Sequence, residues 1–518
     1  MMRLTQGRKA FRFGDAVEAP LFLGFTLALV WWIAAKMLLF QSLQYTADIF
    51  LHLHASRSLV ENGKLLDWIP FNTTLLALHN NFTVALMFPF TMIVNASGFF
   101  VITIAVHGAV LWFLFRARKV DTILKVVVAA LLAGSVGYYL FDNVIYGWNP
   151  ELLFAPFAAL AGLGLTEKRR GVTLIGVLGV FLTREEGAIM LWAIHVLWRT
   201  GQWWAEPNPT RSGSKVVLSL LRITLLWIAV FAISMGFLFW VASVSHSGFQ
   251  ASSRLGAHLS ILWNQPGALQ ASGREFLFIG LICLVPFLAV PELAKFFPLF
   301  LVALLPLYSV MVVASAGYPG GVATFEGVWW PPRFTMIWGV LMGSVLVLGN
   351  GRSDGALEQV FGSSRTRQLA GYLLLIVAVS VLQGWVLTAH RGYSFADRLL
   401  PGRIRATSVL RYFQHEEIRF VDCLSKQLPR RTKLMVSGML AARFDRMTIL
   451  FGSTPSWTQS RGFVCDTNQR VPFHYQCAEN AETRVAQRTW ESVRIGSVMA
   501  GGEPQIAEIA NSCLRPSS

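Results

Sequence analysis

Residues 171–199 read GVTLIGVLGVFLTREEGAIMLWAIHVLWR, two apolar stretches separated by the polar segment Thr183 to Glu186. A helix that crosses the ~30 Å hydrocarbon core of a bilayer needs about 20 apolar residues, and each stretch alone is shorter than that. The sequence therefore allows two half-length helices that turn back at Arg184, or one kinked helix. The choice decides the direction of every later segment.

Apolar runs recur along most of the chain. Of its 518 residues, 54% are hydrophobic and only 14% are charged, whereas about a quarter of the residues of a typical soluble protein are charged. This composition predicts a mainly α-helical, polytopic membrane protein with a bundle of about 11 transmembrane helices. The candidate spans are residues 20–42, 98–116, 124–141, 152–166, 171–183, 187–199, 216–242, 276–292, 296–316, 334–349 and 369–389.

The basic residues decide between the two interpretations of residues 171–199. The chain carries a formal net charge of +16, and its lysines and arginines gather in short clusters between apolar runs. With two helices these clusters share one side, as the positive-inside rule expects of cytoplasmic loops, whereas a kinked helix divides them. We therefore expect two helices and no nucleic-acid partner. The clusters are Arg116 to Lys125, Lys168 to Arg170, Arg199 to Lys215, Lys295 and Arg352 to Arg367.

A polar tail follows the last apolar run. We therefore divide the chain into a transmembrane domain, residues 1–389, and an extracytoplasmic domain, residues 390–518. Residues 416–452 predict a helix, a strand, a short helix and a second strand, and hence a small α/β domain. The remainder, from residue 453 on, is predicted to be loop-rich.

Four of the five cysteines lie in this tail. Four cysteines confined to an extracytoplasmic domain predict two disulfides, and three pairings are open. A zinc site is the rival interpretation, although the spacings contain no C-x-x-C pair. The four residues are Cys423, Cys465, Cys477 and Cys513.

The two-helix topology collects acidic residues on the side opposite the basic clusters. Glu185 and Glu186 interrupt a short apolar hairpin, so we expect them below the membrane surface, where carboxylates line a polar cavity or pair with a cation. Arg184 is the neighbouring cation, so a purely structural pairing stays open. The acidic residues on this side are Asp48, Asp142, Glu151, Glu185, Glu186 and Glu326.

A cavity lined in this way suits group transfer to a hydroxyl. A carboxylate can act as the base, a second carboxylate can hold a divalent metal, and an arginine can bind phosphate through paired hydrogen bonds. Arg333, in the segment WWPPRF at 329–334, is the candidate for phosphate binding. Its structural alternative is an anchor at the membrane interface beside aromatic residues.

Residues 47–66 predict an amphipathic helix at the membrane interface, ended by Asn62-Gly63. Asp48, at its start, is expected to point toward the cavity, one turn from His52, although an aspartate there can serve as a helix cap alone. His52 and His54 fall on different sides of the helix, which argues against a zinc cluster. The apolar stripe is formed by Ile49, Phe50, Leu53, Leu59 and Val60.

Several segments resemble, in the same order, an uncharacterised family of bacterial membrane proteins that is predicted to adopt the GT-C glycosyltransferase fold. Asn149 stands where that family usually has histidine, and Arg184-Glu185-Glu186 replaces Lys-Glu-Asp. Residues 200–330 match it only in hydropathy. The segments are YTADIFLHLHASRSLVENGKLLD at 45–67, HNNFTVALMFPF at 79–90, WNPELLFAPFAALAGLGL at 148–165, FLTREEGAIMLWAIHVLW at 181–198 and LPRRTKLMVSGMLAARFDRMTILFG at 428–452.

The resemblance implies an enzyme of the bacterial cytoplasmic membrane that takes a sugar from a polyprenyl-phosphate donor at the outer face. On this analogy Asp48 is the catalytic base toward an extracytoplasmic glycan, lipid or protein acceptor, and Arg333 contacts the donor phosphate. A divalent metal, Mg²⁺ or Mn²⁺, would lie between Asp48 and Glu151; no other cofactor is expected. The further substrate-binding residues are Glu151, Glu185, Glu186, His52 and His79.

Two other functions stay open. A transporter or flippase for a lipid-linked saccharide would place ionisable residues near the bilayer midplane and usually has repeated halves. A non-catalytic scaffold would use the bundle only to present the tail. It would leave the buried Glu185-Glu186 pair without a purpose.

Overall fold

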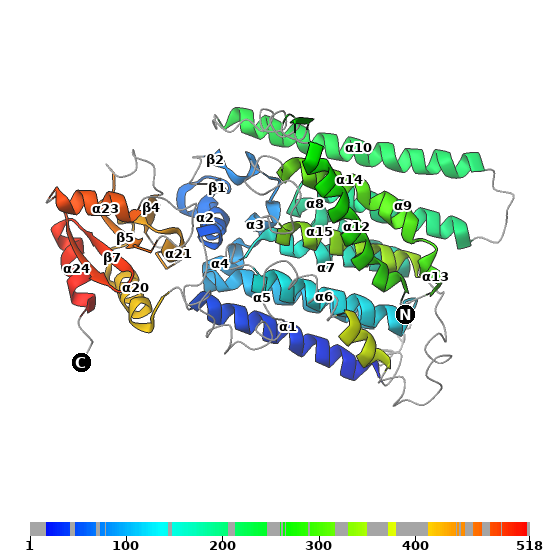
Figure 1. The fold of residues 1–518 in the computed structure, drawn as a ribbon, viewed down its shortest axis with the longest axis horizontal. Helices are drawn as coiled ribbons and strands as arrows, with labels where there is room; N and C mark the ends of the chain where they lie inside the picture. The colour runs from blue at the N-terminus through cyan, green and yellow to red at the C-terminus, as the bar shows by residue number, and fades with distance from the viewer. Residues whose placement is uncertain are drawn as a thin grey trace, which may run out of the picture.

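The computed structural model describes most of the chain, and its described part is mainly helical with a small sheet. A helical bundle and a C-terminal domain lie at opposite ends of the molecule, with the short helix α2 (Ala47–Asn62) where the two meet (Figure 1). The described residues are 17–41, 47–68, 73–77, 79–142, 148–205, 213–245, 260, 263–264, 266–288, 291–315, 330–349, 371–379, 413–441, 443–444, 447–450, 459–468, 477–487 and 489–514.

Each predicted apolar run forms a helix in the part of the chain that the structure describes, and the buried side chains of these helices form one large core. Within the last run, residues 371–379 are helical. The bundle helices are α1 (Glu18–Gln41), α5 (Ser97–Phe115), α6 (Thr122–Asp142), α7 (Phe154–Glu167), α8 (Arg170–Thr183), α9 (Gly187–Ala205), α10 (Gly213–Val244), α12 (Pro266–Leu288), α14 (Phe297–Ser315) and α15 (Trp330–Leu348).

Short elements connect the bundle helices at the end nearest the C-terminal domain. Two-residue strands β1 (Asp67–Trp68) and β2 (Thr73–Thr74) pair antiparallel after α2. The other short elements at this end are the 3-10 helices η2 (Leu75–Ala77) and η3 (Pro150–Leu153) and the helices α3 (Phe82–Leu86) and α4 (Phe88–Val94). A further short helix, α13 (Pro291–Ala294), connects α12 to α14.

Glycines set the packing of the central helices. A Cβ atom at Gly164 of α7 would collide with Thr173 of α8, and one at Gly176 of α8 would collide with Ala161 of α7. Later positions on one helix thus face earlier positions on the other, so α7 and α8 run antiparallel. The missing side chains let the two backbones approach closely, which is typical of helix pairs in membranes.

The direction of α9 follows from its contacts with α15. A Cβ atom at Gly339 would lie 2.8 Å from Met190 Cε of α9 and 3.2 Å from Ala158 Cβ of α7. A Cβ atom at Gly162 of α7 would lie 2.7 Å from Gly343 O. Gly343 in turn faces Ile194. Later residues of α15 thus contact later residues of α7 and of α9, so α15 runs parallel to both helices. Because α8 is antiparallel to α7, residues 171–199 form two antiparallel helices joined by a turn, and the kinked-helix alternative is wrong.

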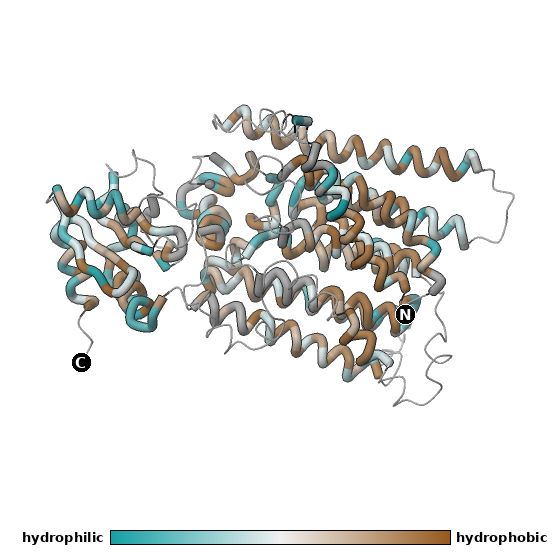
Figure 2. The backbone as a smooth tube through the Cα atoms, in the orientation of Figure 1, coloured by the Kyte–Doolittle hydropathy of each residue, from teal (hydrophilic) through white to brown (hydrophobic). Residues whose placement is uncertain are grey.

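Large apolar side chains are exposed on several helices of the bundle, and hydrophobic residues follow one another along most of the bundle helices (Figure 2). A soluble monomer rarely exposes contiguous apolar patches of this kind. By length and composition, two helices among the described residues are apolar enough to cross a membrane, Ser97–Phe115 and Ser214–Val244; several shorter apolar helices accompany them. Examples of the exposed side chains are Leu23, Leu27 and Trp31 of α1, Leu174 and Ile175 of α8, and Leu221, Leu225, Ile228, Ile233 and Trp240 of α10.

Helix α2 has the predicted limits but only part of the predicted stripe. It ends at Asn62, and Gly63 follows with a positive φ of 74°, the left-handed conformation that glycine adopts readily. The prediction that Leu59 and Val60 lie on the buried stripe is wrong, because they are 56% and 58% exposed. Arg57, in the turn before the last, is buried instead and donates hydrogen bonds to the carbonyl of Thr91 and to the side chain of Asn95.

The C-terminal domain contains a five-stranded sheet with the strand order β4-β3-β5-β7-β6. β3 (Lys433–Val436) pairs parallel with β4 (Thr448–Leu450) and β5 (Gly462–Asp466), whereas β7 (Val498–Gly502) pairs antiparallel with β5 and with β6 (Glu491–Ile495). The helices are α20 (His415–Gln427), α21 (Gly438–Ala441), α23 (Cys477–Ala486) and α24 (Pro504–Leu514). The predicted order of helix, strand, short helix and strand over 416–452 is confirmed.

The prediction of a loop-rich remainder is wrong. β5, α23, β6, β7 and α24 all follow residue 453. Strand β7 is not recognisable in the sequence because it contains Gly501 and Gly502, and glycine is depleted in strands. A side chain at Gly501 would collide with the backbone of Glu491 and Ser492 on β6, so tertiary packing requires the small residue.

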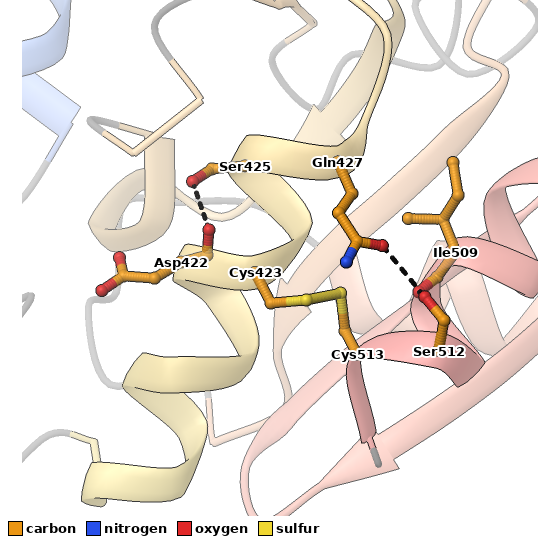
Figure 3. The surroundings of a disulfide bond; sticks show 7 residues. All are labelled: Asp422, Cys423, Ser425, Gln427, Ile509, Ser512 and Cys513. Atoms are coloured by element: carbon orange, nitrogen blue, oxygen red, sulfur yellow. Dashed lines mark hydrogen bonds between the residues drawn. A yellow bond between two sulfur atoms is a disulfide. The ribbon is translucent and has the colours of Figure 1, made fainter. Parts of the chain in front are cut away.

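Two disulfides fasten the domain and select one of the three open pairings. Cys423 of α20 is bonded to Cys513 of α24 (Figure 3), and Cys465 of β5 is bonded to Cys477 at the start of α23. The Cα atoms of the two pairs are 5.7 and 5.6 Å apart. Because all four thiols are used, none is left for the zinc alternative.

Candidate functional site

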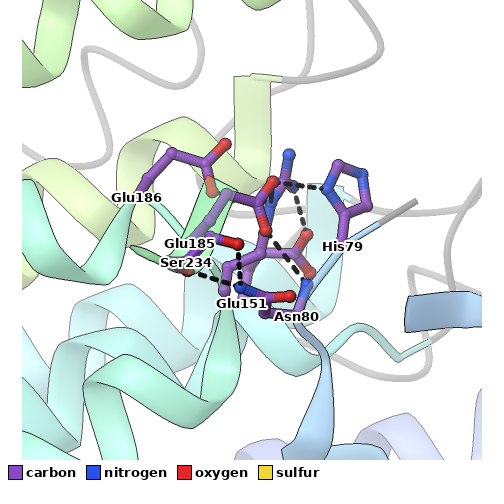
Figure 4. A network of polar contacts seen from close by, with 7 residues as sticks. His79, Asn80, Glu151, Glu185, Glu186 and Ser234 are labelled. Atoms are coloured by element: carbon purple, nitrogen blue, oxygen red, sulfur yellow. Dashed lines mark hydrogen bonds and ion pairs between the residues drawn. The ribbon is translucent and has the colours of Figure 1, made fainter. Parts of the chain in front are cut away.

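A cluster of buried polar side chains lies at the end of the bundle that faces the C-terminal domain (Figures 1 and 4). The turn between α8 and α9 provides Arg184, Glu185 and Glu186, and η3 provides Glu151. His79 and Asn80 come from the segment between η2 and α3. The antiparallel course of α7 and α8 produces this meeting, because η3 precedes α7 and the Arg184 turn follows α8.

Arg184 is the centre of the cluster. Its Nη1 atom donates a 2.6 Å hydrogen bond to Glu151 Oε1, and its Nε atom donates a 3.0 Å hydrogen bond to Glu186 Oε2. Glu185 Oε1 lies 3.9 Å from the same Nε atom. Burial of the side chain favours the neutral form, but Glu186, Glu151 and Glu185 raise the pKa of Arg184 above its ordinary value. The guanidinium therefore stays charged and holds the three carboxyl groups together.

Glu185 is fixed from a second side. His79 Nδ1 lies 2.8 Å from Glu185 Oε1, and the backbone N–H of Asn80 donates a 3.0 Å hydrogen bond to Glu185 Oε2. Burial opposes ionisation, but His79 outweighs it, together with Arg184 and the Asn80 N–H, and the pKa of Glu185 falls from 4.5 to about 2. This carboxylate is therefore ionised at neutral pH.

Glu186 behaves differently although it is the next residue. Burial raises the pKa of Glu186 above its ordinary value; Arg184 opposes the shift, and the neighbouring charge of Glu185 adds to it. Two adjacent carboxyl groups are thus driven toward different protonation states. Such pairs are common at acid–base sites.

Asn80 links the cluster to α10. Its Nδ2 group donates hydrogen bonds to the carbonyl oxygen and the hydroxyl oxygen of Ser234. Among the described residues, Asn80 Oδ1 and Glu151 Oε2 are buried oxygens without a hydrogen-bond partner. Both atoms can accept a hydrogen bond from a donor group, such as a water molecule or a substrate hydroxyl.

His52 joins the cluster from α2. The ring is buried and packs edge-on against Trp148, with ring centroids 5.7 Å apart. Burial lowers the pKa of His52 to about 4; the charge of Glu151 and a hydrogen bond with Asn149 oppose the shift, and His79 adds to it. His54, two residues on, instead lies 3.2 Å from Asp67. The two histidines thus have different surroundings, as predicted.

Three of the predicted site residues have side chains outside the described part of the chain. Asp48 is the second residue of α2, four positions before His52, and Arg333 lies in the first turn of α15. Asp142 is the last residue of α6. Glu326 lies wholly outside the described residues. Since α15 contacts η3, the helix that carries Arg333 adjoins the element that carries Glu151.

Asn80 and Ser234 were not predicted. Asn80 lies in the segment HNN, and its neighbour His79 is a candidate only through the family resemblance. Ser234 is one polar residue inside the long apolar helix α10, and its side chain is buried. A serine within an apolar helix signals helix contacts in general, but no sequence feature pairs it with Asn80.

Among the described residues, no group of three or more histidine, cysteine, aspartate or glutamate side chains is arranged to hold a metal ion. Glu151 is engaged by Arg184 through one oxygen, and the side chain of Asp48 lies outside the described part. No protein-family model matches the chain, and no curated protein or solved structure does.

Proposed function

We propose that the chain is a membrane glycosyltransferase with a GT-C-like bundle of about 11 transmembrane helices. It would move a sugar from a polyprenyl-phosphate donor to an extracytoplasmic glycan, lipid or protein acceptor. The observation that carries the proposal is the gathering of Glu151, Glu185 and Glu186 around Arg184, beside His79 and His52. Buried ionisable groups at the end of an apolar bundle are costly and usually functional.

The distribution of charge supports a membrane orientation for the bundle. The α7–α8 hairpin has the acidic cluster at one end, whereas Lys168, Arg169 and Arg170 connect the two helices at the other end. Arg116 follows α5, and Lys215 lies in the first turn of α10. Basic residues of this kind face the cytoplasm, so the acidic cluster and the disulfide-bonded domain would both face outward.

The cluster has the groups that glycosyl transfer requires. A carboxylate accepts a hydrogen bond from the acceptor hydroxyl, and the family resemblance gives this role to Asp48. A guanidinium binds phosphate oxygens, and Arg333 is the residue proposed for the donor. Arg184 is unsuited to that role, because its Nη1 and Nε atoms already donate hydrogen bonds to Glu151 and Glu186. The buried free oxygens of Glu151 and Asn80 would accept hydrogen bonds from sugar hydroxyls.

A genetic experiment tests the proposal. Cell-envelope glycans from a strain that lacks the gene would be analysed by mass spectrometry and compared with those of strains that express wild type, Asp48→Asn or His54→Gln. We expect wild type and His54→Gln to restore a glycan mass that is absent from the deletion strain, and Asp48→Asn to leave it absent at equal protein level. Full restoration by Asp48→Asn would remove the proposed base.

A second experiment, with purified protein, distinguishes sugar transfer from transport of the intact lipid-linked sugar. Proteoliposomes would receive an undecaprenyl-phosphate sugar that is radiolabelled in the sugar, and labelled lipid in each leaflet and labelled product would be counted. Transfer predicts loss of label from the lipid. Movement of intact lipid between leaflets, with no label released, would favour a flippase and contradict the proposal.

A further inference from the structure

His79 and Glu185 form a carboxylate–imidazole pair. Glu185 Oε1 lies 2.8 Å from His79 Nδ1. A carboxylate accepts hydrogen bonds, so this contact holds the ring proton on Nδ1 and leaves the Nε2 lone pair free to accept another proton. The His79 side chain is 28% exposed, whereas that of Glu185 is 9% exposed. The ring thus reaches from the buried cluster toward its surface.

The pair is preorganised. Glu185 receives the Asn80 N–H through its second oxygen, and Asn80 is anchored to Ser234 of α10. The two oxygens of Glu185 are thus fixed by consecutive residues, His79 through its ring and Asn80 through its backbone. The lowered pKa of Glu185 keeps its carboxylate ionised at neutral pH. A fixed anion behind an imidazole orients the ring and stabilises its protonated form, as in other carboxylate–histidine pairs.

Glycosyl transfer to a hydroxyl releases a proton, and a carboxylate alone holds it poorly. An aspartate of ordinary pKa, about 3.9, is almost fully ionised at neutral pH, whereas imidazole is the side chain that titrates nearest to neutrality. We propose that His79 Nε2 takes up the proton that the acceptor hydroxyl loses, with Glu185 as its positioning residue. This assignment rests on the proposed function: Asp48 accepts the hydrogen bond of the acceptor hydroxyl, and His79 is the residue that holds the released proton.

The step balances without a further reactant. The acceptor O–H bond breaks, and the acceptor oxygen forms a new bond to the anomeric carbon of the sugar. The bond between that carbon and the phosphate oxygen breaks, and its electron pair leaves with the polyprenyl phosphate. The proton stays on His79 until water removes it.

The charged and titratable neighbours of His79 come from several elements. Glu185 and Glu186 interact with it electrostatically from the α8–α9 turn, where Arg184 Nε lies 3.9 Å from Glu185 Oε1. His52 of α2 interacts with His79 electrostatically, and His52 in turn interacts with Glu151 of η3. Of these groups, Glu185 is the one in direct contact with the His79 ring, so its removal is the sharpest perturbation.

The chain contains a matched control pair. His54 Nε2 lies 3.2 Å from Asp67 Oδ2, both side chains are partly buried, and neither belongs to the cluster. The variants His79→Gln and Glu185→Gln are therefore compared with His54→Gln and Asp67→Asn. His79 is partly exposed, so His79→Gln is expected to fold, and a thermal melt of each purified variant checks this.

The first measurement is turnover of a panel of radiolabelled undecaprenyl-phosphate hexoses and pentoses in proteoliposomes, with water as the acceptor. We expect His79→Gln to reduce turnover about 100-fold and to remove the acid limb of the pH–rate profile. Glu185→Gln should shift that limb to lower pH, because the anion that stabilises the protonated ring is gone. The control variants should turn over at the wild-type rate. Normal turnover by His79→Gln, or reduced turnover with an unchanged acid limb, would overturn the assignment.

A second measurement needs no substrate. Diethyl pyrocarbonate modifies neutral imidazole, so the pH dependence of His79 modification, followed by peptide mass spectrometry, reports the protonation of the ring. The midpoint should lie at lower pH in Glu185→Gln than in wild type and should be unchanged in Asp67→Asn. Equal midpoints in wild type and Glu185→Gln would contradict the assignment of Glu185 as the positioning residue of His79. A shifted midpoint without turnover of any donor would instead refute the glycosyltransferase and keep His79 as an acid–base group.

Discussion

Arg184 Nη1 donates a 2.6 Å hydrogen bond to Glu151 Oε1 and so joins two segments that lie 33 positions apart in the sequence. Both side chains are buried. The α7–α8 hairpin makes the contact, because it starts after Glu151 and ends before Arg184. One guanidinium thereby gathers three carboxyl groups at the end of the bundle that faces the disulfide-bonded domain.

Arg184→Gln should destabilise the bundle strongly. Removal of one partner leaves buried carboxylates without their cation, and such losses cost about 3–5 kcal/mol. The thermal midpoint of the purified protein should fall accordingly. Arg461→Gln is the control, because its pair with Glu503 is exposed and close to the same length, 2.7 Å. An equal effect of the two substitutions would contradict the central position of Arg184.

Two neighbouring substitutions should have opposite effects on stability at neutral pH. Glu185→Gln removes an ionised acceptor and leaves Asn80 N–H facing an amide, a loss of about 1–3 kcal/mol. Glu186→Gln should raise the thermal midpoint, because glutamine copies the protonated form that the raised pKa of Glu186 favours. Its remaining oxygen can still accept the hydrogen bond from Arg184. Destabilisation by Glu186→Gln as large as that by Glu185→Gln would contradict the assigned protonation states.

The pH dependence of the Glu185 effect has a defined sign. The pKa of Glu185 is lowered from 4.5 to about 2 in the folded protein, so the unfolded chain binds this proton more tightly. The stability from the ionised group is therefore complete above about pH 4.5 and is lost as the pH falls toward 2. The difference in thermal midpoint between wild type and Glu185→Gln should shrink over this range, and a growing difference would contradict the assignment.

The two disulfides should contribute unequally to the C-terminal domain. Cys423–Cys513 closes a loop of 90 residues and Cys465–Cys477 one of 12 residues. Loop entropy then gives about 4–5 kcal/mol for the first and about 3 kcal/mol for the second. Unfolding of each double-serine variant, followed by hydrogen exchange of the β3 and β5 amides, would measure the difference. A larger loss on removing Cys465–Cys477 would contradict this order.

Phe50→Ala should loosen the contact between the bundle and the C-terminal domain. Phe50 and Leu51 of α2 belong to the apolar core of that domain, whereas Ile49 and Leu53 belong to the core of the bundle. Truncation of a buried phenylalanine costs about 3–5 kcal/mol. Hydrogen exchange of the α20 and α21 amides should therefore become faster, with Leu59→Ala as the exposed control. Unchanged exchange would show that α2 does not support the domain.

Much of the helical architecture follows from residue patterns. The limits of α5 and α8 and the start of α9 follow from apolar runs, whereas α9 continues to Ala205, past its predicted end at residue 199. The direction of α8 and α9 follows from the distribution of basic residues. Asn62-Gly63 ends α2, as glycine after a helix predicts. These features depend on the local sequence or on the spacing of charge along the chain, so they can be predicted without knowledge of which helices touch.

The remaining features depend on contacts between distant segments. Asn80 and Ser234 meet only because α10 packs beside η2, and Arg57 displaces Leu59 from the buried side of α2 through its bonds to Thr91 and Asn95. The cysteine pairing depends in the same way on the packing of α20 against α24. The prediction that acidic residues gather is confirmed for Glu151, Glu185 and Glu186. For Asp48 and Arg333 it stays a prediction.

The most direct test of the glycosyltransferase proposal is a cryo-electron microscopy structure of the full chain with an undecaprenyl phosphate. The account predicts the phosphate at the end of the bundle that carries the Arg184 cluster, with Arg333 in ion-pair contact and Asp48 of α2 facing the same site as His79. A phosphate bound at the opposite end, among Lys168, Arg169 and Arg170, would contradict it. So would an Asp48 side chain that points away from His52 and the cluster.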